Sequence, residues 1–291
     1  MDTSARAPDR TVARNGDIEL GYRLDGPPDG VPLLLSGGVG ATMDTWPQGF
    51  ITLLTERRFR VARYDYRGLG SSTRLPRSAP RFGMADLADD AVAVLDALGW
   101  REANLLGWSA GGAVSQWAAI RHPTRVRTLT SMMSFSAFGI GKWQLRTLLR
   151  LVLGKPTLEA SARRAFRLAS SPGFPPDEQN LDMLLRMLTA PDYDMHAAGR
   201  HNKALRASGD FRAALRLVRV PTLVLHGSAD RIRVIESGLE TLKAIPGAKF
   251  VSYSGWGHDL PRELWPAITA EIQALVDRAL SAVDQRGGAP A

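Results

Sequence analysis

The sequence predicts an α/β protein in which a mainly parallel sheet is covered by helices on both faces, with a helical segment inserted into it. Short, continuous apolar runs bounded by Gly and Pro recur along the chain, as strands buried in a parallel sheet require. Segments with apolar residues at helical spacing lie between these runs. The alternation stops near residue 135 and resumes near residue 220. We therefore predict a core of residues 1–135 and 220–291, with a helical lid over residues 136–219.

The first half of the chain supplies most of the predicted sheet. Residues 18–24 alternate as an edge strand does, and residues 25–30 are rich in turn-forming Gly, Pro and Asp. Residues 84–98 have the clearest helical period, which Gly99 ends. Buried strands are predicted over residues 32–36, 61–64, 104–106 and 126–130.

The predicted lid has little β character. A Pro-rich break over residues 172–176 divides its helical periods, which cover residues 143–152, 161–169 and 181–188. After the lid, the chain returns to strands and helices in turn. We predict a strand over residues 220–225, a helix over 234–245, a strand over 249–253 and a terminal helix over 265–282.

Composition narrows the class of protein. The 291 residues include no cysteine, which excludes disulfides, a thiolate nucleophile and Cys-based zinc sites, and we expect no metal and no cofactor. The chain lacks a run of about 18 uncharged apolar residues, so we expect no membrane span. Residues 1–14 lack the apolar region of a secretory signal, which favours a cytoplasmic protein.

The positive charge is concentrated in the predicted lid. The formal net charge is +8, and residues 136–219 hold 14 Lys and Arg against 7 Asp and Glu, a balance of +7. No helix-turn-helix, zinc-finger or RNP-type motif accompanies this charge, so we expect no nucleic-acid partner. The basic residues are compatible with an ordinary solvated surface or with an acidic carrier protein as partner.

The chemistry is predicted to centre on Ser109, in the run Gly107-Trp108-Ser109-Ala110-Gly111 between a strand and a helix. A Gly-x-Ser-x-Gly turn holds the serine in a strained conformation that exposes its hydroxyl above the sheet. The two glycines leave room for strand and helix to pass closely. The pentapeptide alone is weak evidence for a catalytic serine, because it also occurs by chance. Its position directly after a predicted buried strand strengthens the assignment.

A serine hydroxyl needs a base to take its proton, and the base needs an acid to hold it. His258 follows the predicted strand 249–253, and Asp230 follows the strand 220–225. Both therefore lie at the carboxyl edge of the sheet, where sites of parallel α/β proteins form. Asp230 could instead cap the next helix. The order Ser, Asp, His along the chain is the one expected of α/β hydrolases.

Together these motifs resemble the α/β-hydrolase-fold serine hydrolases over residues 12–283. The matching pieces are the run Ser36–Ala41 before Trp46, residues 64–72, the Ser109 turn, Asp230 and His258. The Gly37-Gly38 start and the run Arg63–Asp65 also resemble methylesterases that act on aromatic polyketides. The resemblance implies that the backbone N–H groups of Gly38 and Ala110 form an oxyanion hole. Ser36 stands where many relatives have His, which alters the support of this loop.

We predict hydrolysis of a carboxylic ester of a hydrophobic small molecule through an acyl-enzyme intermediate. Large apolar residues near Ser109 or the start of the lid are the candidate pocket walls: Trp108, Met133, Phe135, Phe138 and Trp143. The same three groups also serve acyl transferases, thioesterases, perhydrolases and enzymes that cleave a C–C bond beside a carbonyl. A ligand-binding hydrolase fold without activity is a further alternative, although such a receptor needs none of the three.

The remaining polar residues are interpreted as structural. Residues 65–70 lack the Lys-Ser/Thr ending of a phosphate loop and are predicted to form a turn. Asp86, Asp89 and Asp90 lie at a helix start, where acids complement the helix dipole. His122 and His226 are assigned structural roles, and His196 and His201 are predicted to lie on the lid surface or to line the pocket.

Overall fold

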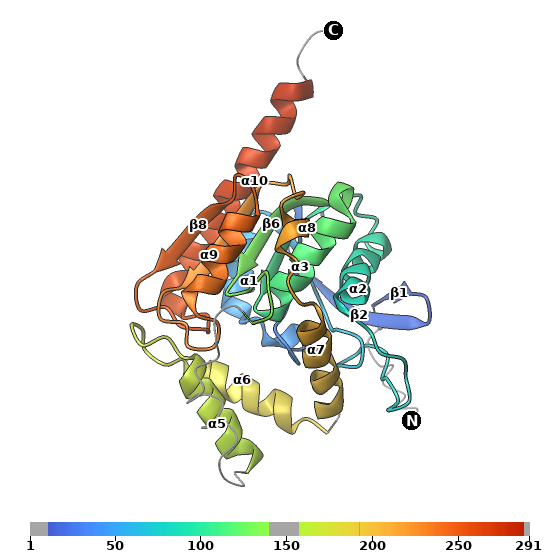
Figure 1. Cartoon of the computed structure of the whole chain (residues 1–291), viewed down its shortest axis with the longest axis vertical. Helices are drawn as coiled ribbons and strands as arrows, with labels where there is room; N and C mark the ends of the chain where they lie inside the picture. The colour runs from blue at the N-terminus through green and yellow to red at the C-terminus, as the bar shows by residue number, and fades with distance from the viewer. Residues whose placement is uncertain (1–10, 140–156, 192, 288–291) are drawn as a thin grey trace, which may run out of the picture.

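A computed structural model of the protein describes residues 11–139, 157–191 and 193–287. These residues form an eight-stranded sheet in the order β1-β2-β4-β3-β5-β6-β7-β8. Figure 1 shows the sheet with helices packed around it. β1 pairs antiparallel with β2 and β2 with β4, whereas every other pair is parallel. The strands are β1 (Val12–Asn15), β2 (Ile18–Asp25), β3 (Val31–Ser36), β4 (Phe59–Tyr64), β5 (Ala103–Trp108), β6 (Val126–Met132), β7 (Thr222–Gly227) and β8 (Lys249–Tyr253).

Each predicted strand is present. β4 begins two residues before its predicted start, β5 and β6 extend two residues past their predicted ends, and β7 lies two residues later than predicted. Their side chains alternate between the two faces of the sheet, as the strand period of two requires. In β3, Leu34 packs in the same cluster as Val94, whereas its neighbour Leu35 packs in the cluster of Phe50 and Ile268. The predicted α/β architecture with a mainly parallel sheet is confirmed.

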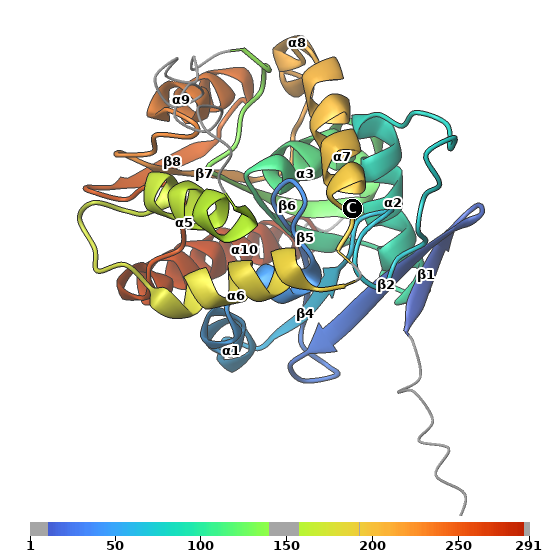
Figure 2. The same cartoon turned by 90° about the horizontal axis from the view of Figure 1, so that it is seen from below.

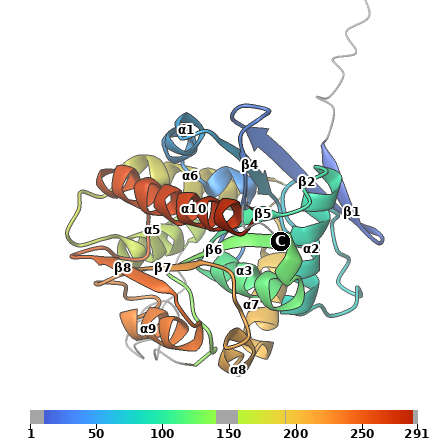
Figure 3. The same cartoon turned by 90° about the horizontal axis from the view of Figure 1, so that it is seen from above.

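Helices cover both faces of this sheet (Figure 3). One face carries α1 (Gln48–Glu56) and α10 (Trp265–Gly287), and the other carries α2 (Met84–Ala97), α3 (Ala110–Arg121) and α9 (Ile235–Ala244). The short helices are η1 (Met43–Thr45), η2 (Pro123–Arg125) and η3 (Arg262–Leu264). Ser109 therefore lies between a strand buried on both faces and a helix packed against that strand.

Further helices stand between β6 and β7: α5 (Leu158–Ala169), α6 (Glu178–Thr189), α7 (Met195–Ala207) and α8 (Arg212–Leu215). Seen from below, α5, α6 and α7 lie across one edge of the sheet (Figure 2). The side chains of Thr157, Asp177 and Asp194 cap the starts of α5, α6 and α7 by accepting backbone N–H groups. α5 and α6 match predicted helices, α7 was not predicted, and the predicted helix over 143–152 lies outside the described residues.

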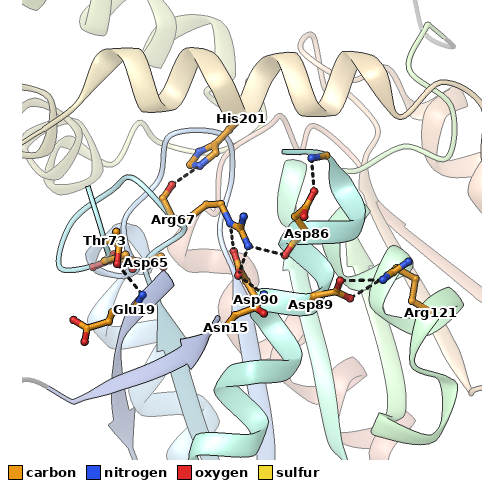
Figure 4. A network of polar contacts seen from close by, with 12 residues as sticks. Asn15, Glu19, Asp65, Arg67, Thr73, Asp86, Asp89, Asp90, Arg121 and His201 are labelled. Atoms are coloured by element: carbon orange, nitrogen blue, oxygen red, sulfur yellow. Dashed lines mark hydrogen bonds and ion pairs between the residues drawn. The ribbon is translucent and has the colours of Figure 1, made fainter. Parts of the chain in front are cut away.

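A buried polar network joins α7 to the core (Figure 4). Arg67 donates from Nε and Nη2 to Asp90, each at 2.6 Å, and Asp90 has no exposed surface. His201 of α7 donates from Nε2 to the backbone carbonyl of Arg67 at 2.9 Å. The imidazole is only 2% exposed and contacts the rings of Tyr66 and Phe82. His201 is therefore neither on the lid surface nor in the pocket wall, because the network beneath α7 encloses it.

Candidate active site

Ser109 occupies the turn between β5 and α3 with φ +56° and ψ −117°, a region that non-glycine residues rarely adopt. The neighbouring glycines make this turn possible. A Cβ on Gly107 would lie 2.1 Å from the carbonyl oxygen of Gly111. A Cβ on Gly111 would lie 1.9 Å from the carbonyl oxygen of Ser36. The strained turn predicted from the Gly-x-Ser-x-Gly spacing is thus present in the backbone.

The structure brings His258 and Asp230 to Ser109. The distance from His258 Nε2 to Ser109 Oγ is 3.0 Å, and that from His258 Nδ1 to Asp230 Oδ2 is 2.6 Å. Because a carboxylate only accepts hydrogen bonds, Nδ1 carries the proton and Nε2 is left to accept the serine hydroxyl. The three side chains form one continuous hydrogen-bonded chain, and all of them come from turns at the carboxyl ends of strands.

Asp230 is buried yet holds a stabilised negative charge. Burial alone would raise its pKa, but the charge and hydrogen bond of His258 outweigh this effect, and the net shift of the pKa is downward. Its other oxygen, Oδ1, accepts the backbone N–H groups of Ile232 at 2.8 Å and Arg233 at 2.7 Å. These bonds hold the local turn. α9 begins later, with Val234 at its N-cap, so Asp230 does not cap that helix.

A second imidazole lies near the same oxygen of Asp230. His226, at the end of β7, has no exposed surface, and its Nε2 lies 3.6 Å from Asp230 Oδ2. The same Nε2 donates to the carbonyl of Arg233 at 2.7 Å, which fixes the tautomer. Burial lowers the pKa of His226, so the ring is neutral at pH 7. It supports the turn that carries Asp230.

The backbone N–H groups of Gly38 and Ala110 lie beside Ser109. A Cβ on Gly38 would be 3.7 Å from Ser109 Cβ, and Ala110 is the first residue of α3. Among the described residues, neither N–H has a hydrogen-bond acceptor. The Tyr66 hydroxyl donates to the carbonyl of Gly37 at 2.9 Å and thereby holds the loop after β3.

Ser36, the last residue of β3, is also held by a hydrogen bond. Ser36 Oγ lies 3.2 Å from the hydroxyl of Tyr64, whose ring is edge-on to that of Tyr66. Tyr64 at the end of β4 and Tyr66 just after it thus hold Ser36 and Gly37, the two residues that precede Gly38. Tyr66 lies within residues 64–72, whose motif resembles the family, but nothing in its local sequence indicates this hydrogen bond.

A cavity of about 390 Å³ opens over Ser109 and His258. Of the predicted wall residues, Trp108 and Phe135 line this cavity. Met133 is fully buried in the cluster on the α1 and α10 face, and Phe138 packs against Phe135 and Arg233 outside the lining. Trp143 lies outside the described residues. Helical residues complete the apolar wall: Ala165, Phe166, Ala169, Met183, Leu184, Met187 and Leu205.

The loop after α5 is hydrogen-bonded to the loop that carries His258. The backbone N–H of His258 donates to the carbonyl of Ala169 at 2.7 Å. The N–H of Gly257 donates to Ser171 Oγ at 2.7 Å, and the N–H of Gly173 donates to the carbonyl of Gly255 at 3.0 Å. Ser171 in turn donates its hydroxyl proton to the carboxylate of Asp259. The segment that follows β6 therefore holds the histidine loop and also contributes residues to the lining of the cavity.

Arg233 and Ser171 are site residues that the sequence analysis missed. A serine in a Pro- and Gly-rich loop carries no signal of its partner, and an arginine three residues after an acid suggests an exposed surface. Within the described part of the chain, no group of three or more His, Asp or Glu residues could hold a metal ion. None of the described helices is long and apolar enough to cross a membrane.

Comparison with known proteins identifies the family. A model of the α/β hydrolase fold family matches residues 31–261. The chain belongs to this family and is a hydrolase of that superfamily, as its motifs predict.

Individual relatives agree with this assignment. Rhodomycin D methylesterase DauP of Streptomyces sp. strain C5 is 28% identical over 92% of this chain and 97% of its own length, which confirms the predicted resemblance to methylesterases. 2-Hydroxymuconate semialdehyde hydrolase of Pseudomonas putida is 30% identical over 83% of this chain and 86% of its own. The crystal structure of a hydrolase from Pseudomonas aeruginosa PA01 superposes with a TM-score of 0.73 at 30% identity, covering 94% of this chain and 99% of the other.

Proposed function

We propose that the protein hydrolyses a carboxylic ester of a hydrophobic small molecule with Ser109 as nucleophile, His258 as base and Asp230 as the orienting acid. The observation that carries this proposal is the unbroken chain of hydrogen bonds, 2.6 Å from Asp230 to His258 and 3.0 Å from His258 to Ser109. This chain of hydrogen bonds ends at Ser109, which lines a mostly apolar cavity. The similarity to a methylesterase supports an ester as the substrate.

The geometry is suited to acyl transfer through an acyl-enzyme. Ser109 Oγ attacks the ester carbonyl as His258 Nε2 takes its proton, and the carbonyl oxygen becomes an oxyanion held by the N–H groups of Gly38 and Ala110. The imidazolium then gives its proton to the departing alcohol. Water attacks the acyl-enzyme by the same route in reverse. Asp230 stabilises the imidazolium, in keeping with the lowered pKa of its carboxyl.

We also propose that residues 136–219 act as a lid on the core of residues 1–135 and 220–291. The residues of α5 and α6 that line the cavity are apolar except for Asn180, whereas Arg163, Arg167 and Arg186 of the same helices are exposed. An amphipathic arrangement of this kind presents an apolar roof to the substrate. It favours bulky acyl or aromatic esters over acetate. A clear preference for acetyl esters would contradict this assignment.

The acidic carrier protein considered from the charge of residues 136–219 has no support among the relatives, whose names refer to small molecules. The dependence of kcat/KM on salt concentration distinguishes an acidic carrier protein from a free neutral ester as the substrate. Attraction of an acidic carrier to exposed arginines is screened within about 10 Å at 0.1 M salt, so kcat/KM would fall steeply as salt is raised. For a free neutral ester we expect kcat/KM to stay nearly flat over the same range.

A fluorophosphonate label tests for an activated serine without knowledge of the substrate. We expect labelling of the wild type and none of Ser109→Ala, together with loss of ester hydrolysis by several orders of magnitude. Ser115→Ala is the matched control, because this buried hydroxyl on α3 has no hydrogen-bond partner among the described residues. It should be labelled as the wild type is.

Two results would contradict the proposal. Labelling that persists in Ser109→Ala would place the nucleophile elsewhere. A folded wild type that binds apolar ligands tightly but is neither labelled nor active would favour a receptor. Product analysis with and without added alcohol or thiol then distinguishes hydrolysis from acyl transfer, since only a transferase forms the new ester or thioester in preference to the free acid.

A further inference from the structure

The loop after β3, which carries the N–H of Gly38, has little packing of its own. Three of its residues 37–41 are glycine, and Val39 is 42% exposed. Glycine restrains the backbone less than any other residue, so such a loop keeps one conformation only when other groups hold it. An oxyanion hole needs its N–H groups fixed in direction before the reaction begins. Contacts from outside the loop therefore decide how well it can serve as one.

One such contact is the hydroxyl of Tyr66, which donates to the carbonyl of Gly37. This carbonyl belongs to the same planar peptide as the N–H of Gly38, so the hydrogen bond fixes the direction of that N–H. The loop then turns back on itself. The N–H of Ala41 donates to the carbonyl of Gly38 at 3.2 Å, and Gly40 within this turn has φ +70°.

The second contact comes from the segment between α6 and α7. The hydroxyl of Tyr193 donates to the carbonyl of Gly40 at 3.0 Å. This carbonyl belongs to the peptide whose N–H, that of Ala41, closes the turn onto Gly38. Because a peptide is planar, the tyrosine fixes the direction of both groups at once. A hydrogen bond to the carbonyl of a peptide also polarises its N–H, which strengthens the next bond in the chain.

Tyr193 is itself held in place. Its ring is partly buried against the cluster on the α2 and α3 face, and its N–H donates to the carbonyl of Ala190 at 3.0 Å. α7 begins two residues later and lies close to the loop, because a Cβ on Gly40 would be 2.9 Å from that of Ala198. The same helix is joined to the core through His201. The hydroxyl therefore reaches the loop from a fixed support.

We propose that Tyr193 is a positioning residue of the oxyanion hole, which acts on the N–H of Gly38 through the Gly40–Ala41 peptide. This inference rests on the proposed function, because it assigns that N–H to the oxyanion. Tyr193 lines a neighbouring cavity of about 810 Å³ and not the cavity over Ser109. Its hydroxyl therefore acts on the loop rather than on the reacting part of the substrate. The segment between β6 and β7 then holds the oxyanion loop as well as the histidine loop.

Tyr193→Phe removes only the hydroxyl and tests this role. With para-nitrophenyl butyrate as the substrate, we expect kcat/KM to fall by about 3- to 10-fold, the size of one neutral hydrogen bond. Loss of a substrate contact could produce the same fall. A second measurement must therefore report on the oxyanion alone.

A pair of ketone inhibitors separates the oxyanion from binding of the uncharged ligand. Ser109 Oγ adds to the carbonyl of phenethyl trifluoromethyl ketone, its proton passes to His258 and the carbonyl oxygen becomes an oxyanion. Phenethyl methyl ketone resists this addition and binds as the free ketone. In Tyr193→Phe, the inhibition constant of the fluorinated ketone should rise by the same factor as kcat/KM falls. The inhibition constant of the methyl ketone should stay unchanged.

Tyr22→Phe is the matched control, because Tyr22 lies on β2 and its hydroxyl has no hydrogen-bond partner among the described residues. Its kcat/KM and both inhibition constants should equal those of the wild type. Should Tyr193→Phe fail to fold in urea titrations, Tyr193→Met fills the same space without a hydroxyl. It is then judged by the same ratio of the two inhibition constants.

The two proposals fail in different ways. A wild type that is labelled at Ser109 and hydrolyses the ester, with the same kcat/KM and inhibition constants as Tyr193→Phe, removes the role of Tyr193 alone. Equal weakening of both ketones by the variant also overturns that role, because the hydroxyl would then act on substrate binding. Absence of both labelling and hydrolysis in the wild type removes the proposed function instead.

Discussion

Replacement of His201 by Phe should make the protein less sensitive to acid. The imidazole is buried between α7 and the core, where it donates to the carbonyl of Arg67. Burial, followed by the positive charges of Arg67 and Arg200, outweighs that hydrogen bond and lowers its pKa from the ordinary 6.5 to about 4. Protonation of this ring therefore opposes folding, and phenylalanine removes the titration.

The sign and size of the effect follow from linkage between proton binding and folding. Between pH 6.5 and pH 4 the unfolded chain binds a proton at His201 that the folded chain does not, so stability falls as the pH falls through this window. One pKa unit corresponds to about 1.4 kcal/mol. At pH 5 the loss is about 2 kcal/mol relative to pH 7.5, and it approaches about 3 kcal/mol near pH 4.

Urea unfolding at pH 7.5 and pH 5.0, followed by tryptophan fluorescence, measures this difference. The wild type should lose about 2 kcal/mol more of its unfolding free energy over this interval than His201→Phe does. At pH 7.5 the variant itself should be less stable by about 1–3 kcal/mol, because the buried carbonyl of Arg67 loses its donor.

His196→Phe provides the control, since His196 lies on the same helix but is exposed. Its acid sensitivity should equal that of the wild type. Equal losses between pH 7.5 and pH 5.0 in wild type and His201→Phe would refute the reasoning, because the ring would then titrate alike in both states.

Three further predictions concern the site and its supports. Asp230→Asn should lower kcat/KM by about 10⁴-fold, because an amide holds the imidazole in the wrong tautomer, and a loss below tenfold in steady-state assays would place the acid elsewhere. Tyr66→Phe should lower kcat by about 5- to 30-fold through the loss of about 1–2 kcal/mol that holds the Gly37 carbonyl; an unchanged kcat would show that the loop needs no such support. Gly111→Ala should destabilise the fold by about 3 kcal/mol or more in urea titrations, because the new Cβ would lie 1.9 Å from the backbone of β3. Gly199→Ala, where the new Cβ has no atom within 4 Å, should instead stabilise α7 by about 0.5–1 kcal/mol. Similar effects of the two substitutions would argue against the close packing of the Ser109 turn.

The centre of the sheet could be predicted because strands such as β5 and β7 are buried on both faces, and short apolar runs of this kind are typical of strands in a parallel sheet. α7 gives no comparable signal. Its buried positions are Ala197, His201, Ala204 and Leu205, so the sequence lacks a clear apolar stripe. The helix is held by long-range contacts instead, including three bonds from Arg200 to carbonyls of residues 76–80. Pairings across more than a hundred residues leave no local pattern.

The three reacting groups could be located from sequence because each follows a strand, and parallel strands bring their carboxyl ends to one edge. The walls of the cavity could not be located in the same way. Met133 follows β6 immediately, but with φ +49° its side chain joins the buried cluster away from the cavity. Arg233 is charged and follows another arginine closely, which favours a surface position. The rings of Phe135 and Phe138, about a hundred residues earlier in sequence, pack against its guanidinium in the fold, and such distant partners leave no mark on the local sequence.

The bonds between residues 169–173 and the histidine loop bear on how this scaffold can be diversified. A segment that only lines the substrate cavity can be exchanged between relatives without disturbing the reacting groups. Residues 169–173, the last residue of α5 and the loop after it, are not such a segment, because the carbonyl of Ala169 and the hydroxyl of Ser171 accept the N–H groups of His258 and Gly257. A chimaera joined within residues 169–173 would combine the histidine loop of one protein with hydrogen-bond acceptors from another. Junctions placed after Gly173 would keep the pair together, and α6 and α7 could then vary while the base stays in register with the nucleophile.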